Sequence, residues 1–226
     1  MQRHRMHAVA LSRDIRPGQP HRNINTVDAT ILPSFDAGRS GYNGAMILIR
    51  HGQSEFNLHF SATKVDPGIR DPKLTPLGHQ QAEDAAATLA SAPITRIIAS
   101  PYTRALQTAA PFARRFGLPI AISPLVRERY KFVCDIGSPL SALNDTWPEQ
   151  DFGDLEEHWW PAETESEAAT RGRAADFHIE MAARPDHAET LVVTHWAFIL
   201  AMTGQTLNNG EWIVVEPNAR FDASAA

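Results

Sequence analysis

The chain has 226 residues, a hydrophobic fraction of 43% and a formal net charge of −5, so it holds enough apolar material for one folded domain. The acidic balance argues against a general nucleic-acid binder or a binder of anionic membranes, because both functions need a basic surface. A small anionic substrate is still compatible with it, since a few local arginines outweigh a mild global charge.

The cysteine count and the absence of long apolar runs predict a cytoplasmic protein. The single cysteine, Cys134, rules out an intramolecular disulfide and a zinc site built on paired cysteines. No apolar run approaches the roughly 18 residues of a membrane span. The basic start of the chain is not followed by the apolar stretch of a secretory signal. We therefore expect neither a membrane nor a nucleic acid as a partner.

Residues 1–45 differ from the rest of the chain. They mix Arg, Pro, Gly, Asn and Ser without sustained periodicity, as in RDIRPGQPHRN, and predict a poorly ordered N-terminal extension. Within it, TVDATILPSF (26–35) fits either an edge strand or a surface segment. The folded domain is expected at residues 46–226, and a true start at Met46 is an alternative interpretation of the same boundary.

From residue 46 onward, strand and helix patterns alternate. Short apolar runs typical of buried parallel strands occur at 46–50, 94–100, 118–123, 189–195 and 211–217. Helical patterns lie at 75–91, 101–116, 163–183 and 196–204. This alternation predicts a three-layer α/β/α sandwich with right-handed crossovers over a largely parallel central sheet.

Local signals predict where two of these helices begin and end. Thr75 and Ser100 each precede a proline, so both place a hydroxyl at the N-cap and proline at the first helical position. Gly117 is expected to close the helix at 101–116 and Pro111 to kink it.

Residues 127–161 are irregular and too long for a connector in a compact domain, which predicts a lid or a substrate-side insertion. The segment is rich in Pro, Gly and Asp, and its aromatic residues are Tyr130, Trp147, Phe152, Trp159 and Trp160. These rings fit two interpretations. They either anchor a long loop to the core or form a hydrophobic wall for an organic phosphate ester.

Four polar residues fall at the same edge of the predicted sheet. Arg50 and His51 end the first strand, Arg104 lies in the first turn of the helix after the second strand, and His195 ends the strand at 189–195. In open α/β sheets, ligands bind at the carboxyl edge of the strands. Arginine matches the geometry of phosphate oxygens, and helix N-termini add N–H groups. The sequence therefore predicts a pocket for a compact dianion.

Each of these residues has a simpler explanation when it is taken alone. A histidine at a strand end is more often structural than catalytic, and a lone arginine more often forms a surface ion pair. Two histidines also suit a metal ion, but no carboxylate stands at the spacing of a metal motif and the arginines would repel a cation. Convergence through independent strands favours the anion site, and no metal is expected.

Five segments also resemble, in order, the histidine phosphatase superfamily, the phosphoglycerate mutase-like proteins that carry an RHG motif. They are LIRHGQSEFN (48–57), LTPLGHQQA (74–82), IIASPYTRALQTA (97–109), LVRERY (125–130) and VVTHWAF (192–198). RHG alone is a weak signal, whereas five segments in family order, spanning about residues 46–217, are a strong one. The resemblance implies a phosphoglycerate mutase-like fold and chemistry without a metal or another cofactor.

The resemblance also implies a role for each matching residue. His51 would attack phosphorus and become a phosphohistidine, and Glu128 would protonate the leaving oxygen and later activate water. The phosphoryl oxygens would be held by Arg50, Asn57, Arg104 and His195. The residue chemistry agrees, because a neutral imidazole is a competent nucleophile near pH 7 and preorganised positive charge suits phosphoryl transfer.

Two departures from the family pattern bear on these roles. Trp196 stands where the family commonly has glycine after its second histidine, and the glycine that usually follows the acidic residue is absent. Asp135 and Asp154 are therefore alternatives to Glu128 as the proton donor, although loop capping is the simpler role for both. Cys134 has no evident partner and fits a small buried residue better than a nucleophile.

The combined prediction is a metal-independent phosphatase that hydrolyses a small phosphate monoester through a phosphohistidine on His51. A phosphoglycerate mutase-type phosphotransferase is the alternative within this chemistry, although the insertion adds few cations for a bisphosphate, namely Arg127, Arg129 and Lys131. A catalytically idle phospholigand-binding protein of the same fold is the third interpretation. Loss of a histidine or an arginine would have marked it, and all are present. The sequence specifies neither the substrate nor the oligomeric state.

Overall fold

Five strands build one mixed sheet in the order β3-β2-β4-β1-β5. The strands are β1 (Met46–Arg50), β2 (Arg96–Ala99), β3 (Ile120–Ile122), β4 (Thr190–Thr194) and β5 (Trp212–Val215). The first four run parallel, and β5 pairs antiparallel with β1. This computed structural model describes residues 45–215, which belong to a unit formed by residues 35–226. The candidate strand at 26–35 lies outside the described residues.

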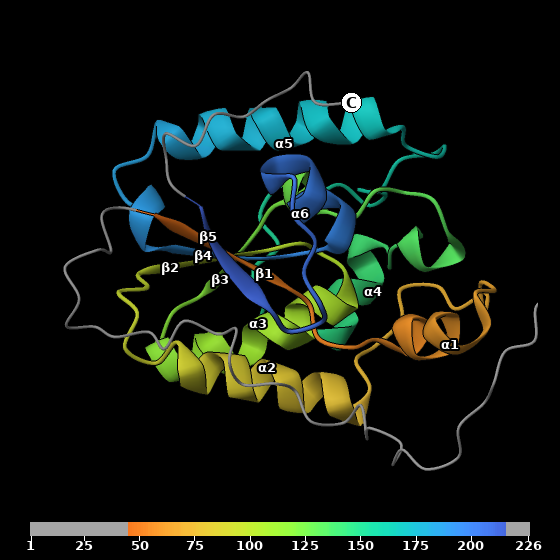
Figure 1. Cartoon of the computed structure of the whole chain (residues 1–226), viewed down its shortest axis with the longest axis horizontal. Coiled ribbons are helices and arrows are strands. Elements are labelled where there is room, and N and C mark those ends of the chain that lie inside the picture. The colour runs from red at the N-terminus through yellow and green to blue at the C-terminus, as the bar shows by residue number, and fades with distance from the viewer. Residues whose placement is uncertain (1–44, 216–226) are drawn as a thin grey trace, which may run out of the picture. The chain divides into compact units, whose positions relative to one another are not determined.

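Two helices cover each face of this sheet (Figure 1). On one face lie α2 (Pro76–Thr88) and α3 (Thr103–Phe116), and on the other lie α5 (Glu167–Ala182) and α6 (Trp196–Thr203). Alternate residues of β1 enter two separate cores, with Ile47 and Ile49 facing α2 and α3 and with Met46 and Leu48 facing α5 and α6. The predicted three-layer sandwich is therefore confirmed.

One of the two predicted helix starts is correct. Thr75 caps α2 through its hydroxyl, but α3 begins after Tyr102 and not after Ser100, and Tyr102 makes no side-chain cap. The cap comes instead from a distant loop, where Asp71 accepts from the backbone N–H of Thr103 at 2.9 Å and from its hydroxyl at 2.7 Å. The local signal failed here because a tertiary contact supplies the acceptor.

Two helices end at glycines, one of them the predicted Gly117. Gly117 closes α3 with a φ of 66° and Gly204 closes α6 with a φ of 69°, a conformation that costs glycine little. Pro111 lies inside α3. The start of α5 was placed too early, because Glu165 stays in the preceding loop and Ser166 forms the N-cap.

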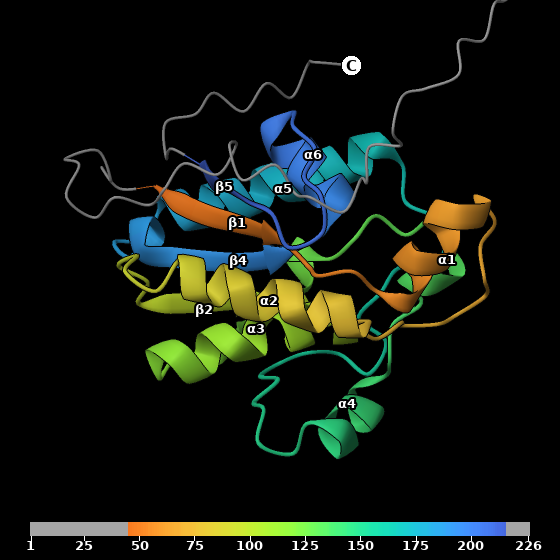
Figure 2. The same ribbon diagram turned by 60° about the horizontal axis from the view of Figure 1, so that its bottom comes forward.

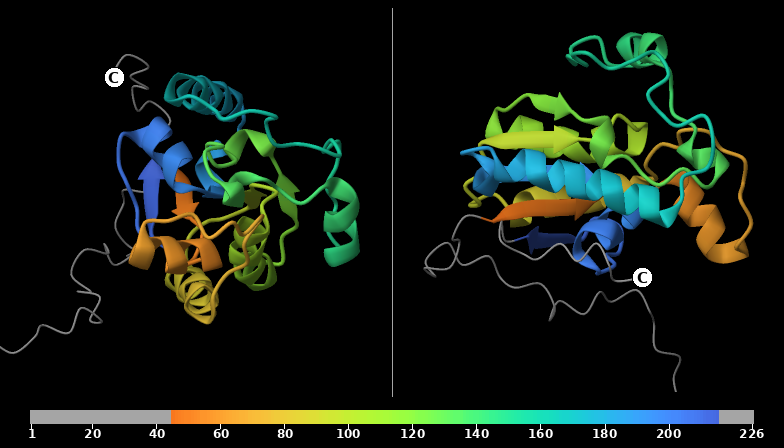
Figure 3. Two further views of the ribbon diagram at one scale, coloured as in Figure 1. Left: turned by 90° about the vertical axis from the view of Figure 1, so that its right-hand side faces the viewer. Right: turned by 90° about the horizontal axis from the view of Figure 1, so that it is seen from above.

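Two helices were not predicted, α1 (Glu55–Thr63) and α4 (Leu140–Thr146). The apolar pattern of α1 is weak, since Phe56 is its single buried residue. A capping box between Ser54 and Asn57 starts it. Figures 2 and 3 show α1 beyond the carboxyl ends of β1 and β4. No helix within residues 45–215 is long and apolar enough to cross a membrane.

The segment at 127–161 is fastened to the core on the α2 and α3 face. Trp159 and Phe152 are buried there, with Trp147 and Trp160 packed against the same core. The indole N–H of Trp159 donates to the carbonyl of Ser138 at 2.9 Å. These contacts support the interpretation that the rings anchor the segment.

Candidate active site

The carboxyl ends of β1, β2 and β4 bring together residues that lie far apart in the sequence. Arg50 is the last residue of β1 and His51 follows it, His195 follows β4, and Arg104 lies in the first turn of α3 after β2. The rings of His51 and His195 are 5.1 Å apart between centroids, at 58° to one another. The four residues predicted to converge therefore share one site.

His51 has the geometry of a neutral nucleophile. Its side chain is buried, and its Nδ1 lies 2.7 Å from the carbonyl oxygen of Gly52. Because a carbonyl accepts and does not donate, Nδ1 carries the proton and Nε2 keeps its lone pair. Burial, with Arg104 and Arg50 nearby, holds the pKa of His51 well below its usual range. The imidazole is thus neutral near pH 7.

A pair of glycines lets the loop after His51 pass close to the start of α2. A Cβ on Gly52 would lie 2.3 Å from the carbonyl oxygen of Gly78, and a Cβ on Gly78 would lie 2.1 Å from that of Gln53. Both distances are far inside van der Waals contact and involve backbone atoms, which move only if the loop or the helix shifts.

Gly52→Ala should lower the free energy of unfolding by about 1–3 kcal/mol and displace His51, because the added methyl group overpacks this contact. Gly172→Ala is a matched control, since Gly172 lies inside α5 and a methyl group added there would have no neighbour within 4 Å. The control should stabilise the protein by about 0.5–1 kcal/mol. Urea unfolding of both variants checks the prediction, which fails if Gly52→Ala is as stable as the wild type.

His195 is completely buried, and neither of its ring nitrogens has a hydrogen-bond partner within the described residues. Tyr102 packs edge-on against its ring, with the centroids 5.2 Å apart. Burial and the nearby charge of Arg104 hold the pKa of His195 well below its usual range. Buried polar atoms are rarely left unpaired in folded proteins, so this ring is suited to donate to a bound group.

The two buried histidines should make the protein less stable as the pH falls. Their pKa values are lowered in the folded state, so below about pH 6.5 the unfolded chain binds more protons. Each histidine then costs about 1.4 kcal/mol of unfolding free energy per pH unit until its own folded pKa is reached. Glu128, whose pKa is raised, acts in the opposite sense.

Urea midpoints measured between pH 8 and pH 5.5 test this linkage. Because Glu128 opposes it, the informative quantity is the difference between the wild type and His195→Asn. The slope of the unfolding free energy against pH should be smaller in the variant, by the amount that corresponds to about one bound proton. Equal slopes in the two proteins would contradict the prediction.

Arg50 is held by the loop that precedes β5. Its Nη1 donates to the carbonyl of Leu207 at 2.7 Å, and its backbone N–H donates to that of Glu211 at 3.0 Å. Its Nε is buried without a partner in residues 45–215. One edge of the guanidinium is therefore fixed by the protein, while another donor is left for a ligand.

Arg104 is buried close to the two histidines. Its Nη1 donates to the carbonyl of Cys134 at 2.9 Å, and its Nη2 lies 3.3 Å from Oδ1 of Asp135. Its guanidinium stacks on the ring of Tyr102 at 4.2 Å. The helix also supports the loop that follows His51, because Thr108 accepts from the backbone N–H of Gly52 at 3.1 Å.

Glu128 reaches the same site from the segment after β3. Its Oε1 accepts from the backbone N–H of Arg129 at 2.8 Å and from that of Ala197, in the first turn of α6, at 3.0 Å. Burial and the charge of Asp135 raise the pKa of Glu128. Trp196, the first residue of α6, is 36% exposed next to this contact. A carboxyl group with a raised pKa beside two arginines suits proton donation.

A buried ion pair fixes the segment that carries Glu128. Arg173 of α5 pairs with Glu165 at 2.6 Å and donates to the carbonyls of Leu125 and Arg127 at 2.6 and 2.8 Å. The carbonyls on either side of Val126 are thus held from α5, which limits the positions that the next residue, Glu128, can take.

A model of the histidine phosphatase superfamily (branch 1) matches residues 46–215. The chain belongs to this superfamily. It is 36% identical over 85 residues to the glucosyl-3-phosphoglycerate phosphatase of Mycolicibacterium vanbaalenii, covering 38% of this chain and 36% of that protein. It is also 32% identical over 155 residues to the probable phosphoglycerate mutase GpmB of Yersinia enterocolitica, covering 66% of this chain and 68% of that protein.

Solved structures of histidine phosphatase-like proteins share the fold. Mycobacterial glucosyl-3-phosphoglycerate phosphatase complexed with VO3 matches with a TM-score of 0.54 and 20% identity, over 75% of this chain and 90% of that one. An Entamoeba histolytica phosphoserine phosphatase mutant in complex with phosphoserine matches with a TM-score of 0.51 and 20% identity, over 75% and 89%. The predicted phosphoglycerate mutase-like architecture is confirmed.

Asn57 lies next to the loop that follows His51, but its side-chain oxygen already accepts hydrogen bonds from the protein. Oδ1 accepts from the backbone and hydroxyl of Ser54 at 3.1 and 2.9 Å and from Nδ2 of Asn209 at 3.1 Å. The Nδ2 group of Asn57 is the part left to donate to a substrate. Asn209 also donates to the carbonyl of His51 at 3.1 Å. Sequence reasoning missed Asn209, because LNNGE before the last strand has the composition of an ordinary turn.

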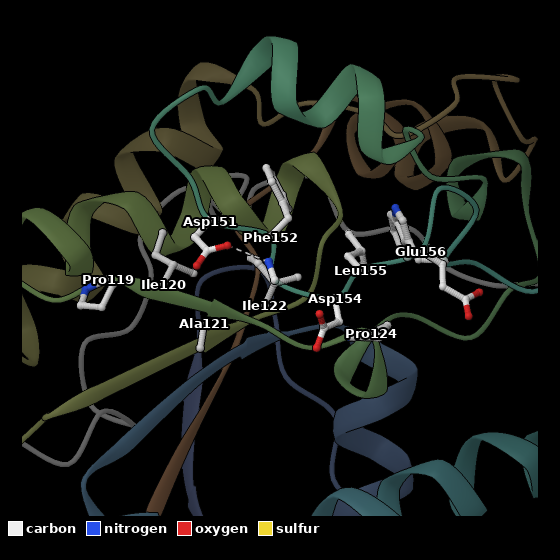
Figure 4. Close-up of a pocket in the computed structure, with 12 residues that line it drawn as sticks. Pro119, Ile120, Ala121, Ile122, Pro124, Asp151, Phe152, Asp154, Leu155 and Glu156 are labelled. Carbon is white, nitrogen blue, oxygen red and sulfur yellow. Dashed lines mark hydrogen bonds between the residues drawn. The ribbon is translucent and has the colours of Figure 1, made fainter.

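The other candidate residues are placed differently from Glu128. Asp154 is exposed and lines a cavity of about 710 Å³ beside β3, together with Ile122, Phe152 and Trp159 (Figure 4). Asp135 is buried and bonded to Arg104. Burial raises the pKa of the Cys134 thiol, which disfavours the thiolate that a nucleophile requires. This supports the interpretation of Cys134 as a small buried residue.

Proposed function

We propose that the chain is a metal-independent phosphatase that hydrolyses a phosphate monoester through a phosphohistidine on His51. The observation that carries this proposal is the pair of buried histidines. His51 presents an unprotonated Nε2, and His195 lies 5.1 Å away with both nitrogens unpaired among the described residues. A relative that is named as a phosphatase, together with the superfamily itself, supports hydrolysis of phosphate esters.

In the first step, the lone pair on Nε2 of His51 attacks phosphorus while the bond from phosphorus to the ester oxygen breaks. Arg50 and Arg104 neutralise the charge of the phosphoryl oxygens and His195 donates a hydrogen bond to one of them, which is the main contribution to catalysis of this transfer. The departing oxygen takes the proton of the Glu128 carboxyl group and leaves as an alcohol. The ring of His51 then carries the phosphoryl group and a positive charge.

In the second step, water attacks phosphorus from the side that the alcohol has left. The Glu128 carboxylate accepts a proton from this water, and the bond between phosphorus and Nε2 breaks. The electron pair returns to the imidazole, so that His51 is again neutral and inorganic phosphate is released. Glu128 has then served once as an acid and once as a base.

A phosphoglycerate mutase-type transfer is a second candidate, because the relative that matches over 68% of its length is named as a mutase. Mutases hold a bisphosphate and need additional cations. Of the three cations in the insertion, Arg127 pairs with Glu165 at 3.2 Å and Arg129 with Glu167 at 2.7 Å, which leaves Lys131. This pairing leaves little charge for a second phosphate and favours hydrolysis.

Phosphate release from alkyl and aryl phosphates in the presence of EDTA tests the proposal. We expect turnover of both, and we expect alkaline quenching to trap a base-stable phosphoenzyme whose phosphorylated peptide contains His51. No release from any ester, together with vanadate-induced thermal stabilisation, would favour a phospholigand-binding protein. Interconversion of phosphoglycerates that is primed by 2,3-bisphosphoglycerate and outpaces phosphate release would favour the mutase.

A further inference from the structure

Asp135 is a buried carboxylate whose two oxygens both accept hydrogen bonds. Oδ2 accepts from the backbone N–H groups of Lys131 and Phe132, each at 3.0 Å. Oδ1 faces Nη2 of Arg104 at 3.3 Å and the thiol of Cys134 at 3.4 Å. The side chain is only 2% exposed. These contacts leave no free oxygen to protonate a leaving group, which argues against Asp135 as the acid.

The same residue organises the surroundings of Arg104. The hydroxyl of Tyr102 donates to the backbone carbonyl of Asp135, and the Tyr102 ring stacks on Arg104 at 4.2 Å. The neighbouring carbonyl of Cys134 accepts from Nη1 of Arg104 at 2.9 Å. Arg104 is thus held on two edges and one face by a single short turn, Val133–Asp135, and its tyrosine partner.

The carboxylates of Asp135 and Glu128 also both accept hydrogen bonds from the backbone of one short segment, residues 129–132. Glu128 accepts from the N–H of Arg129, and Asp135 accepts from those of Lys131 and Phe132. The charge of Asp135 contributes to the raised pKa of Glu128 after burial, the largest cause. Glu128 also interacts electrostatically with Arg104 from α3, Arg50 from β1, Tyr102 before α3 and Cys134.

We propose, on the basis of the proposed phosphatase function, that Asp135 is a positioning residue that orients Arg104 toward the phosphoryl group. It touches neither the substrate nor the reacting atoms. Its effect on the reaction passes through the cation that holds the phosphoryl group and the acid that releases the alcohol.

The test is the pH profile of kcat/KM for Asp135→Asn with an alkyl phosphate and with p-nitrophenyl phosphate. Loss of the negative charge should move the alkaline fall for the alkyl ester down by about one pH unit. The aryl ester, whose leaving group needs no proton, should show no such shift. Asp145→Asn, an exposed change on α4, should behave as the wild type. Displacement of Arg104 should in addition lower kcat/KM for both esters. Wild-type kcat/KM for both esters, or an equal loss on both without the shift, would overturn the proposal.

A measurement without turnover separates this proposal from the proposed function. Infrared difference titration of the wild type against Glu128→Gln reports when the Glu128 carboxyl group ionises. We expect ionisation above the ordinary glutamate range, and at lower pH in Asp135→Asn. If that variant does not fold, Asp135→Ser, which also removes the charge, should show the same lowering, and ionisation at the wild-type pH in either variant overturns the proposal. If the wild type releases no phosphate, the proposed function fails, and the titration still decides the role of Asp135.

Discussion

Replacing His51 by asparagine should lower phosphate release by on the order of 10⁴-fold or more, because the reaction loses the atom that forms the bond to phosphorus. The rest of the site is kept, since carbonyls hold Arg50 and Arg104 and the ring of His195 also packs against Tyr102. Orthovanadate should therefore still raise the melting temperature of the variant. Initial rates with an aryl phosphate, in EDTA, measure the loss.

His79→Asn is the matched control for this change, because His79 is exposed on α2. It should keep full activity and show that the loss is specific to the site. The assignment of the nucleophile is wrong if His51→Asn retains turnover close to that of the wild type, or if the alkaline-stable phosphoenzyme still forms in this variant.

Replacing Glu128 by glutamine should cost on the order of 10²–10⁴-fold in kcat/KM for an alkyl phosphate, because the departing alkoxide then has no proton donor. The loss should be much smaller for p-nitrophenyl phosphate, whose leaving group departs without a proton. Glutamine keeps an oxygen that can accept from the N–H groups of Arg129 and Ala197, the partners of the native carboxylate, so the fold should be preserved.

The pH profile of the wild type adds an independent check on the same residue. The acid must be protonated in the first step, so kcat/KM for an alkyl ester should fall as the pH rises through the raised pKa of Glu128. Glu128→Gln should abolish this fall, whereas Glu180→Gln, an exposed change on α5, should retain it. Equal losses on alkyl and aryl esters would show that Glu128 is not the proton donor.

The sequence predicted a large part of the fold because the central strands β1, β2 and β4 are buried on both faces. Runs such as Met46–Arg50 and Thr190–Thr194 are apolar and short, and buried parallel strands have that pattern. The chain order of strands and helices then implied the layers. Strand β5 was also predicted, but its antiparallel pairing with β1 was not. A short apolar run has the same pattern in a parallel strand and in an antiparallel one.

Signals confined to a few residues were less reliable where a distant group completed the local structure. Ser100 looked like a helix cap, but Asp71 supplies the acceptor to Thr103 across the loop. At Ser100, therefore, a polar partner that is remote in sequence outweighs the propensity of the neighbouring residues. The start of α5 is set locally, because the hydroxyl of Ser166 caps the helix by accepting from the N–H of Ala169.

By itself, the sequence determined the layer architecture, the strand ends and the presence of Arg50, His51, Arg104 and His195 at one sheet edge, because strand periodicity and parallel crossovers place these residues without further information. Only the tertiary structure decided how they are held. Asn209 meets the carbonyl of His51 from a segment 158 positions away. Hydrogen bonds of this kind depend on side-chain direction and burial, and neither is encoded in the spacing of residues along the chain.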